Sequence, residues 1–173
     1  LVLALVFGVS KFITNNGILE RNTVAVTIGE HELSNADLNY YYVDQINEFL
    51  NQYGSYASMF GLDLTKPLNE QVTNQETGAT WADDFITSAI SAAKHNYALV
   101  DAAKAAGYEL TEEELASIDN NINSLSLYAS LYGYTDAESY IRAMYGKGAN
   151  EKSFREYLHT QALATSYYSN YAT

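Results

Sequence analysis

A single proline, Pro67, stands in this chain of 173 residues. Proline lacks a backbone N–H and breaks a helix when it falls in the interior, so its scarcity leaves long helices uninterrupted. Apolar residues recur at helical spacing on both sides of Pro67. We therefore expect a mainly α fold in which Pro67 lies in the one long loop, between residues 54 and 80.

One segment near the beginning has the period of a β-strand instead. Val24, Val26 and Ile28 alternate with Ala25 and Thr27, which is the pattern of a half-buried strand. The dipeptide at 29–30 can form a tight turn, and residues 31–33 can form a short return strand. The sequence thus predicts a short N-terminal β-hairpin.

Four to five helices are expected after this hairpin. Hydroxyl and acidic residues at the correct offsets mark where helices begin, and glycines mark where they end. The expected helices are 35–53 after the capping pair Ser34 and Asp37, 81–106 between Thr80 and Gly107, 112–132 after Thr111, 136–145, and a last helix after Asn150.

The first residues are apolar. Residues 1–9 form an uninterrupted apolar run, which is too short to span a membrane and lacks the basic flank of a signal peptide. We interpret residues 1–13 as a truncated signal or membrane-anchor segment and residues 14–23 as a polar spacer. A buried amphipathic helix is the alternative interpretation of the first segment.

Charge and cysteine content exclude several classes of function. A formal net charge of −12 argues against binding to nucleic acid, which needs clustered cations. The absence of cysteine excludes disulfides, thiolate metal sites and thiol nucleophiles within this sequence. Acidic residues are concentrated between Asp101 and Tyr140, and this face is either simply solvated or suited to basic partners.

No catalytic or metal-binding constellation is visible in the sequence. His31, His95 and His159 fall on three different expected elements, and none has a second ligand at helical spacing. The segment 146–148 (GKG) lacks the spacing of a phosphate-binding loop, and no Gly-x-Ser-x-Gly motif occurs. We expect no metal, no cofactor and no catalytic residues in this chain taken alone.

Tyrosine is unusually frequent, with 16 copies. Tyr40, Tyr41 and Tyr42 point to different sides of one expected helix, so a single apolar stripe cannot bury all three. Tyrosine offers a large contact area, a polar tip and few rotamers to freeze, which suits the binding of extended polypeptide. The alternative is that most tyrosines fill the helical core with their hydroxyls toward solvent.

Several segments together resemble a known family. Residues 24–30 (VAVTIGE) followed by 33–38 (LSNADL) resemble the opening of the SurA-like N-terminal domain of SurA- and PrsA-type extracytoplasmic peptidyl-prolyl isomerases. Residues 98–114, an Ala-Lys-x-x-Gly helix end before a hydroxyl-capped acidic turn, are similar to a later signature of the family. Residues 61–63, 67–68 and 78–81 look like the membrane-anchored versions from Gram-positive bacteria. The likeness covers about residues 24–172.

This resemblance implies a chaperone domain that holds unfolded secreted polypeptides outside the membrane. The catalytic parvulin domain of many relatives is absent from the sequence, so the domain over residues 24–173 is expected to be non-catalytic. The expected partners are unfolded or partly folded secreted polypeptides, and the membrane through residues 1–13. The location is expected to be extracytoplasmic, either membrane-anchored or secreted at a bacterial cell surface.

The candidate client-binding residues lie in two aromatic-rich segments. They are Tyr53, Tyr56, Met59, Phe60, Tyr128 and Tyr132. Residues 56–61 (YASMFG) and 128–133 (YASLYG) look alike, and we attribute that likeness to chance. Two alternatives remain open: an adaptor domain that docks one folded partner at the cell surface, and an isomerase whose catalytic domain lies outside this sequence. The oligomeric state is also open.

Overall fold

The computed structural model describes residues 21–171, and the expected class is confirmed: an antiparallel β-hairpin precedes five α-helices in this part of the chain. The interpretations of residues 1–13 and of most of 14–23 lie outside the described residues. In chain order the elements are β1 (Val24–Ile28), β2 (His31–Ser34), α3 (Asn35–Tyr53), η1 (Gly54–Phe60), η2 (Leu68–Glu70), β3 (Val72–Asn74), β4 (Ala79–Thr80), α4 (Trp81–Ala105), α5 (Glu112–Leu131), α6 (Ala137–Tyr145) and α7 (Glu151–Tyr171).

The N-terminal hairpin forms at the expected residues. β1 pairs with β2, and Gly29 takes a φ of +59°, which the tight turn requires. The His31 Nε2 atom lies 2.7 Å from Oδ1 of Asp101 on α4, and the His31 ring packs on Tyr97 with centroids 4.4 Å apart. These two contacts fix the hairpin against α4.

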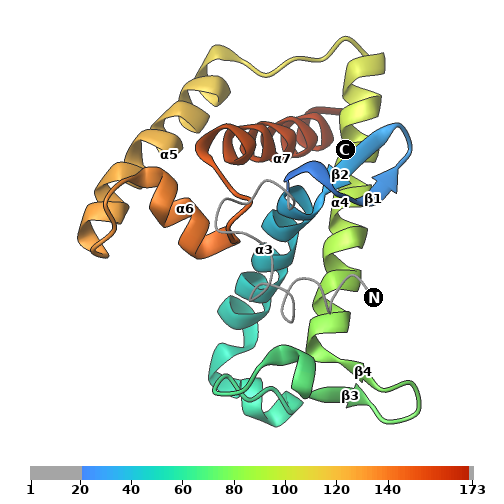
Figure 1. The fold of residues 1–173 in the computed structure, drawn as a ribbon. Coiled ribbons are helices and arrows are strands. Elements are labelled where there is room, and N and C mark those ends of the chain that lie inside the picture. Colours follow the sequence, from blue (N-terminus) through green and yellow to red (C-terminus); the bar gives the residue numbers. More distant parts are fainter. Residues whose placement is uncertain (1–20, 172–173) are drawn as a thin grey trace.

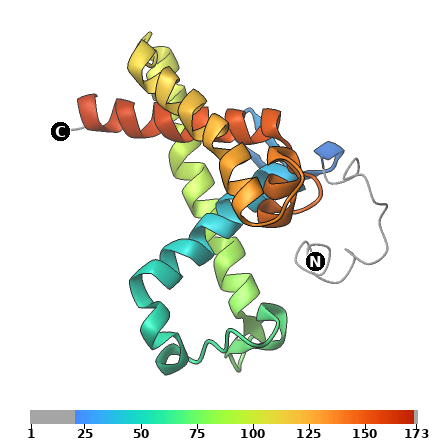
Figure 2. The ribbon, with the colours of Figure 1, turned by 90° about the vertical axis from the view of Figure 1, so that its left-hand side faces the viewer.

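Helices α3 and α4 run in opposite directions along the molecule, and α7 packs across α4 (Figure 1). Leu33, Leu38, Phe85 and Ile141 are among the buried residues of the main core, which these helices share. A smaller apolar cluster joins the end of α4 to α7. Figures 1 and 2 both place η1, β3 and β4 at one end of the molecule and α5 and α7 at the other.

Three consecutive tyrosines on α3 are all buried, although one apolar stripe cannot hold them. Tyr40 stacks on Tyr157 with ring centroids 5.1 Å apart, and Tyr41 meets the same ring edge-on at 5.0 Å. Tyr42 instead contacts Phe85 edge-on at 6.5 Å. All three are buried because α3 has neighbours on more than one side, with α7 toward Tyr40 and Tyr41 and α4 toward Tyr42.

The expected helix starts are confirmed by their capping geometry. Ser34, Thr80, Thr111 and Asp136 each accept a hydrogen bond from the backbone N–H three residues later, within reciprocal capping boxes. Gly107 takes a φ of +66° after the end of α4, as a left-handed C-terminal cap requires. Local hydrogen bonding thus sets where these helices begin and where α4 ends.

The segment 54–80 is more ordered than the sequence analysis expects. It contains two 3₁₀ helices and a second small antiparallel hairpin, β3–β4. The buried side chain of Gln71 holds the loop together: its Nε2 donates to the carbonyl oxygens of Asp63 (2.9 Å) and Lys66 (3.0 Å), and its Oε1 accepts from the Asp63 N–H (2.7 Å). Gln71 thus holds residues 63–67 through side-chain hydrogen bonds, whereas β3 and β4 pair through their backbones.

None of the helices in residues 21–171 combines the length and the apolar character that a bilayer-crossing segment needs.

Candidate functional site

Five of the six predicted client-binding side chains are exposed, and they fall into two separate groups. Tyr56, Met59 and Phe60 belong to η1, and we call them the η1 patch. Tyr128 and Tyr132 lie at the end of α5. The sixth residue, Tyr53, is half-buried. The predicted residues therefore form two surfaces, one for each aromatic-rich segment of the sequence.

The η1 patch stands on an aromatic base. The ring of Phe60 lies 5.2 Å from the ring of Tyr53 and 6.0 Å from that of Phe49. Phe49 in turn packs on Trp81 at 5.1 Å and on Phe85 at 5.7 Å, within the main core. Tyr53 thus supports the patch, while the side chains of Tyr56 and Met59 are exposed to solvent.

A hollow of about 410 Å³ lies beside the η1 patch. Its walls include Ala57, Leu62 and the exposed side chain of Leu64. Ser58 and Asp63 also line the hollow, so its wall is partly polar. Ala57 and Leu62 are buried, and Leu64 is the exposed apolar side chain beside η1.

The second group extends beyond the two predicted tyrosines. Leu127, Tyr128, Leu131 and Tyr132 occupy neighbouring positions on one face of α5, all four are exposed, and we call them the α5 patch. The opposite face of α5 buries Ile118, Ile122 and Ala129 against the rest of the protein. The two leucines are not among the predicted residues, because they lie outside the buried stripe of this helix; the four-residue step from 127 to 131 marks the exposed face.

Part of the α5 patch is positioned by α6. The Tyr132 ring stacks on Tyr140 with centroids 5.9 Å apart and planes 7° apart, and Tyr134 meets Tyr140 edge-on at 5.4 Å. Burial raises the pKa of Tyr140, as does repulsion from the neighbouring tyrosine hydroxyls. Tyr132 therefore has one face of its ring covered and its outer face available.

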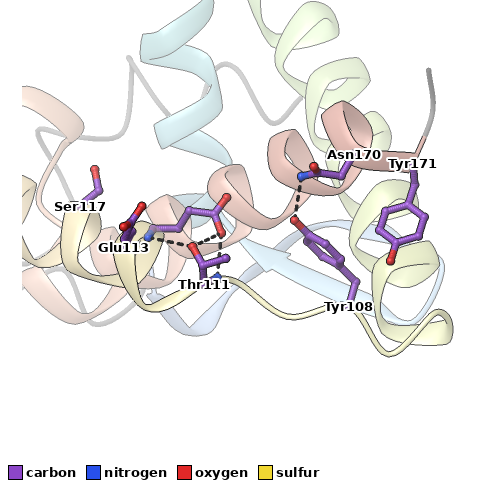
Figure 3. A pocket seen from close by; sticks show the side chains of 7 residues that line it. Tyr108, Thr111, Glu113, Ser117, Asn170 and Tyr171 are labelled. Atoms are coloured by element: carbon purple, nitrogen blue, oxygen red, sulfur yellow. Dashed lines mark hydrogen bonds between the residues drawn. The ribbon is translucent and has the colours of Figure 1, made fainter.

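A third surface feature is an open hollow of about 700 Å³ where the start of α5 meets the end of α7. Figure 3 shows Tyr108, Asn170 and Tyr171 on one side of it and Thr111, Glu113 and Ser117 on the other. Asn170 Nδ2 donates to the Tyr108 hydroxyl at 3.0 Å, and Ser166 Oγ lies 2.5 Å from the same hydroxyl.

Four polar residues that line this hollow already have structural partners: Tyr108, Thr111, Glu114 and Asn170. Hydrogen bonds from Ser166, then from the backbone and hydroxyl of Thr111, hold the pKa of Glu114 below its usual range. The Thr111–Glu114 contacts form the capping box of α5, and Tyr108 joins the α4–α5 connection to α7. These contacts account for those four residues as structural links.

The described part of the chain holds no group of three His, Asp or Glu side chains placed to bind a metal ion. His31, His95 and His159 lie on β2, α4 and α7, and His31 is engaged with Asp101.

The polar network within the core is also structural. The Tyr157 hydroxyl donates to the carboxylate of Asp44, and Gln161 Nε2 donates to the Tyr157 hydroxyl at 2.6 Å. Asn96 Nδ2 in turn donates to Gln161 Oε1.

Comparison of the chain with protein-family models, with curated proteins and with solved structures gives no match.

Proposed function

We propose that this protein is an extracytoplasmic protein-folding factor: a non-catalytic chaperone domain of the peptidyl-prolyl isomerase-like kind that binds unfolded secreted polypeptides. The observation that supports the proposal is the presence of two exposed apolar patches, on η1 and α5, in a chain with a net charge of −12. Large exposed apolar groups on a well-packed protein mark interaction sites.

The chemistry of the two patches suits an unfolded client better than one folded partner. Each patch combines aromatic rings with a flexible or branched aliphatic side chain, Met59 in one case and Leu131 in the other. Methionine adapts its shape to different partners, and tyrosine adds area and a hydrogen-bonding tip. Such surfaces bind many apolar sequences with modest selectivity.

The proposed place of action is outside the membrane, with residues 1–13 belonging to a membrane-anchor or signal segment. The apolar run 1–9 and the resemblance of residues 24–172 to the SurA-like domain support this part of the proposal. A chain without cysteine also needs no particular redox environment.

Suppression of aggregation tests the proposal. A chemically denatured protein is diluted into buffer with this chain in several-fold molar excess, and light scattering is followed. We expect wild-type protein to reduce scattering strongly. A variant with Tyr56→Ser, Met59→Ser, Tyr128→Ser and Leu131→Ser should lose most of that effect.

Tyr168→Ser provides the matched control, because Tyr168 is an exposed tyrosine on α7 outside both patches. The control variant should suppress aggregation like wild type. No suppression by wild-type protein would refute the chaperone function. Equal suppression by wild type and by the fourfold variant would refute the assignment of the patches.

A prolyl isomerisation assay on a short peptide substrate addresses the non-catalytic part of the proposal. We expect the rate to equal the uncatalysed background. Turnover above background with this chain would contradict it and would favour an isomerase.

A further inference from the structure

The two look-alike hexapeptides, residues 56–61 and 128–133, end in the same backbone motif. Gly61 and Gly133 have φ values of +80° and +78°. The N–H of each glycine bonds to the serine carbonyl three residues earlier, at 3.1 Å for Gly61 and 3.3 Å for Gly133. The next N–H bonds to the alanine carbonyl five residues earlier, Leu62 to Ala57 at 3.0 Å and Tyr134 to Ala129 at 2.8 Å. This is the Schellman arrangement in both copies.

The two copies also divide their side chains between core and solvent in the same way. The alanine of each copy, Ala57 or Ala129, is buried. The tyrosine, the aliphatic residue and the second aromatic residue are exposed in both, by 60%, 80% and 53% in η1 and by 46%, 69% and 69% in α5. Each copy is therefore one helical turn with a buried alanine, a glycine stop and three large apolar groups facing solvent. The likeness between residues 56–61 and 128–133, which the sequence alone left as chance, therefore corresponds to a shared backbone and burial pattern.

The two patches lie toward opposite ends of α3. The η1 patch directly follows the C-terminal end of α3. The α5 patch packs against α6, whose last residue, Tyr145, accepts a hydrogen bond from Asn39 near the start of α3. α3 itself measures about 28 Å over its nineteen residues, so the two copies belong to different regions of the molecule. A client that contacts both copies must therefore be an extended chain, because a single side-chain cluster reaches only one of them.

Charge indicates which partner fits. Both copies are followed by a carboxylate, half-buried in Asp63 and exposed in Asp136. Hydrogen bonds from Thr65 lower the pKa of Asp63, and hydrogen bonds from Ser139 lower that of Asp136. Lys66 lies 3.1 Å from Asp63 and offsets part of its charge, but the whole chain carries −12. A second copy of the chain would bring another −12, so self-association is opposed and a cationic partner is favoured.

We propose that the two copies are equivalent docking points for a single extended polypeptide, whose apolar side chains are interspersed with lysine or arginine. This inference rests on the proposed chaperone function and adds to it the number of contact points and the chemistry of the client. Two linked contacts raise affinity without any new interaction, because the second binding event becomes intramolecular. A weak apolar preference at each copy then suffices for useful retention of a client.

The test uses fluorescent synthetic peptides and measures anisotropy. One peptide carries a single block of leucine, tyrosine and lysine; the others carry two such blocks joined by Gly-Ser linkers of increasing length. We expect the two-block peptides with long linkers to bind at least about tenfold more tightly than the one-block peptide. Linkers too short to span the two copies should give little gain.

Matched variants identify the two docking points. Tyr56→Ser with Met59→Ser disables one copy, and Tyr128→Ser with Leu131→Ser disables the other at the equivalent positions. These side chains are exposed, so we expect both variants to fold, as circular dichroism and thermal melts will verify. Each variant should lower the two-block affinity to the one-block level while changing one-block affinity by about twofold, the statistical factor for losing one of two equal sites.

Other results would overturn the inference in distinguishable ways. Equal affinity for one-block and long two-block peptides would show a single site and would leave the chaperone function intact. Stronger binding by peptides with glutamate in place of lysine would contradict the charge argument. A dimer in sedimentation equilibrium that dissociates in both variants would identify a second copy as the occupant. Absence of both peptide binding and aggregation suppression would refute the proposed function itself.

Discussion

The hydroxyl of Tyr157 on α7 donates a hydrogen bond to the carboxylate of Asp44 on α3, inside the packed part of the molecule. Burial raises the pKa of Asp44 above its usual value of 3.8, and the hydrogen bond from Tyr157 lowers it in part. The folded protein therefore holds the Asp44 proton more tightly than the unfolded chain does. Stability contributed by this group is highest below pH 3.8 and is lost as pH rises through the raised pKa.

Tyr157→Phe should lower the free energy of unfolding by about 1–3 kcal/mol at pH 7, because the half-buried carboxylate of Asp44 loses its hydrogen-bond donor. The penalty should shrink at pH 4, where Asp44 accepts a proton more readily. Urea denaturation at the two pH values measures both quantities. In an Asp44→Asn background the penalty should no longer depend on pH; a penalty that is equal at both pH values in the native background would contradict the account.

Thr111→Ala should lower the free energy of unfolding by about 1 kcal/mol, because the first turn of α5 loses its side-chain cap. Thr111→Ser keeps the hydroxyl and should be close to neutral. Thr87→Ala, an exposed change inside α4, serves as a control for the loss of a threonine away from a cap. The alanine variant should also move the pKa of Glu114 toward its usual value, which NMR titration measures.

The Asp63 carboxyl should titrate far below an ordinary aspartate. Hydrogen bonds from the hydroxyl and backbone of Thr65, with help from Lys66, lower its pKa to about 2. A lowered pKa in the folded state stabilises the fold above pH 3.8, and this contribution is lost as pH falls toward 2. NMR titration checks the value, and Thr65→Val should raise it; an unchanged pKa in that variant would disprove the assigned cause.

Gly61→Ala and Gly133→Ala should each lower the free energy of unfolding by about 1 kcal/mol. An added Cβ meets no atom within 4 Å at either position, so the cost comes from the positive φ alone. Gly54→Ala is the matched control, because Gly54 has a φ of −53° and should tolerate alanine without loss. Thermal or urea unfolding of the three variants shows whether the positive φ costs the same free energy of unfolding in the two hexapeptides.

Local signals predicted much of this fold. A hydroxyl or acid followed three residues later by a hydrogen-bonding partner identified the starts of α3, α4 and α5, because capping depends on residues that are adjacent in sequence. The alternation at Val24, Val26 and Ile28 identified the hairpin for the same reason. These features need no knowledge of distant contacts.

Features that depend on distant residues were missed. Burial of all three tyrosines from Tyr40 to Tyr42 requires α4 and α7 on different sides of α3, which no local pattern records. The order of segment 54–80 depends on Gln71 reaching back to the backbone of Asp63 and Lys66. The α5 patch was found only through its tyrosines, because exposed leucines such as Leu131 resemble core residues when only the sequence is known.

Binding to one protein in two states tests the central claim most directly. The same test protein is prepared native and as a reduced, alkylated chain that stays unfolded in buffer, and its affinity for this protein is measured by fluorescence anisotropy. We predict saturable binding to the unfolded form, loss of that binding in the fourfold patch variant, and no binding to the native form. Equal affinity for native and unfolded forms, or no binding to the unfolded form, would contradict the claim that these patches hold unfolded polypeptides.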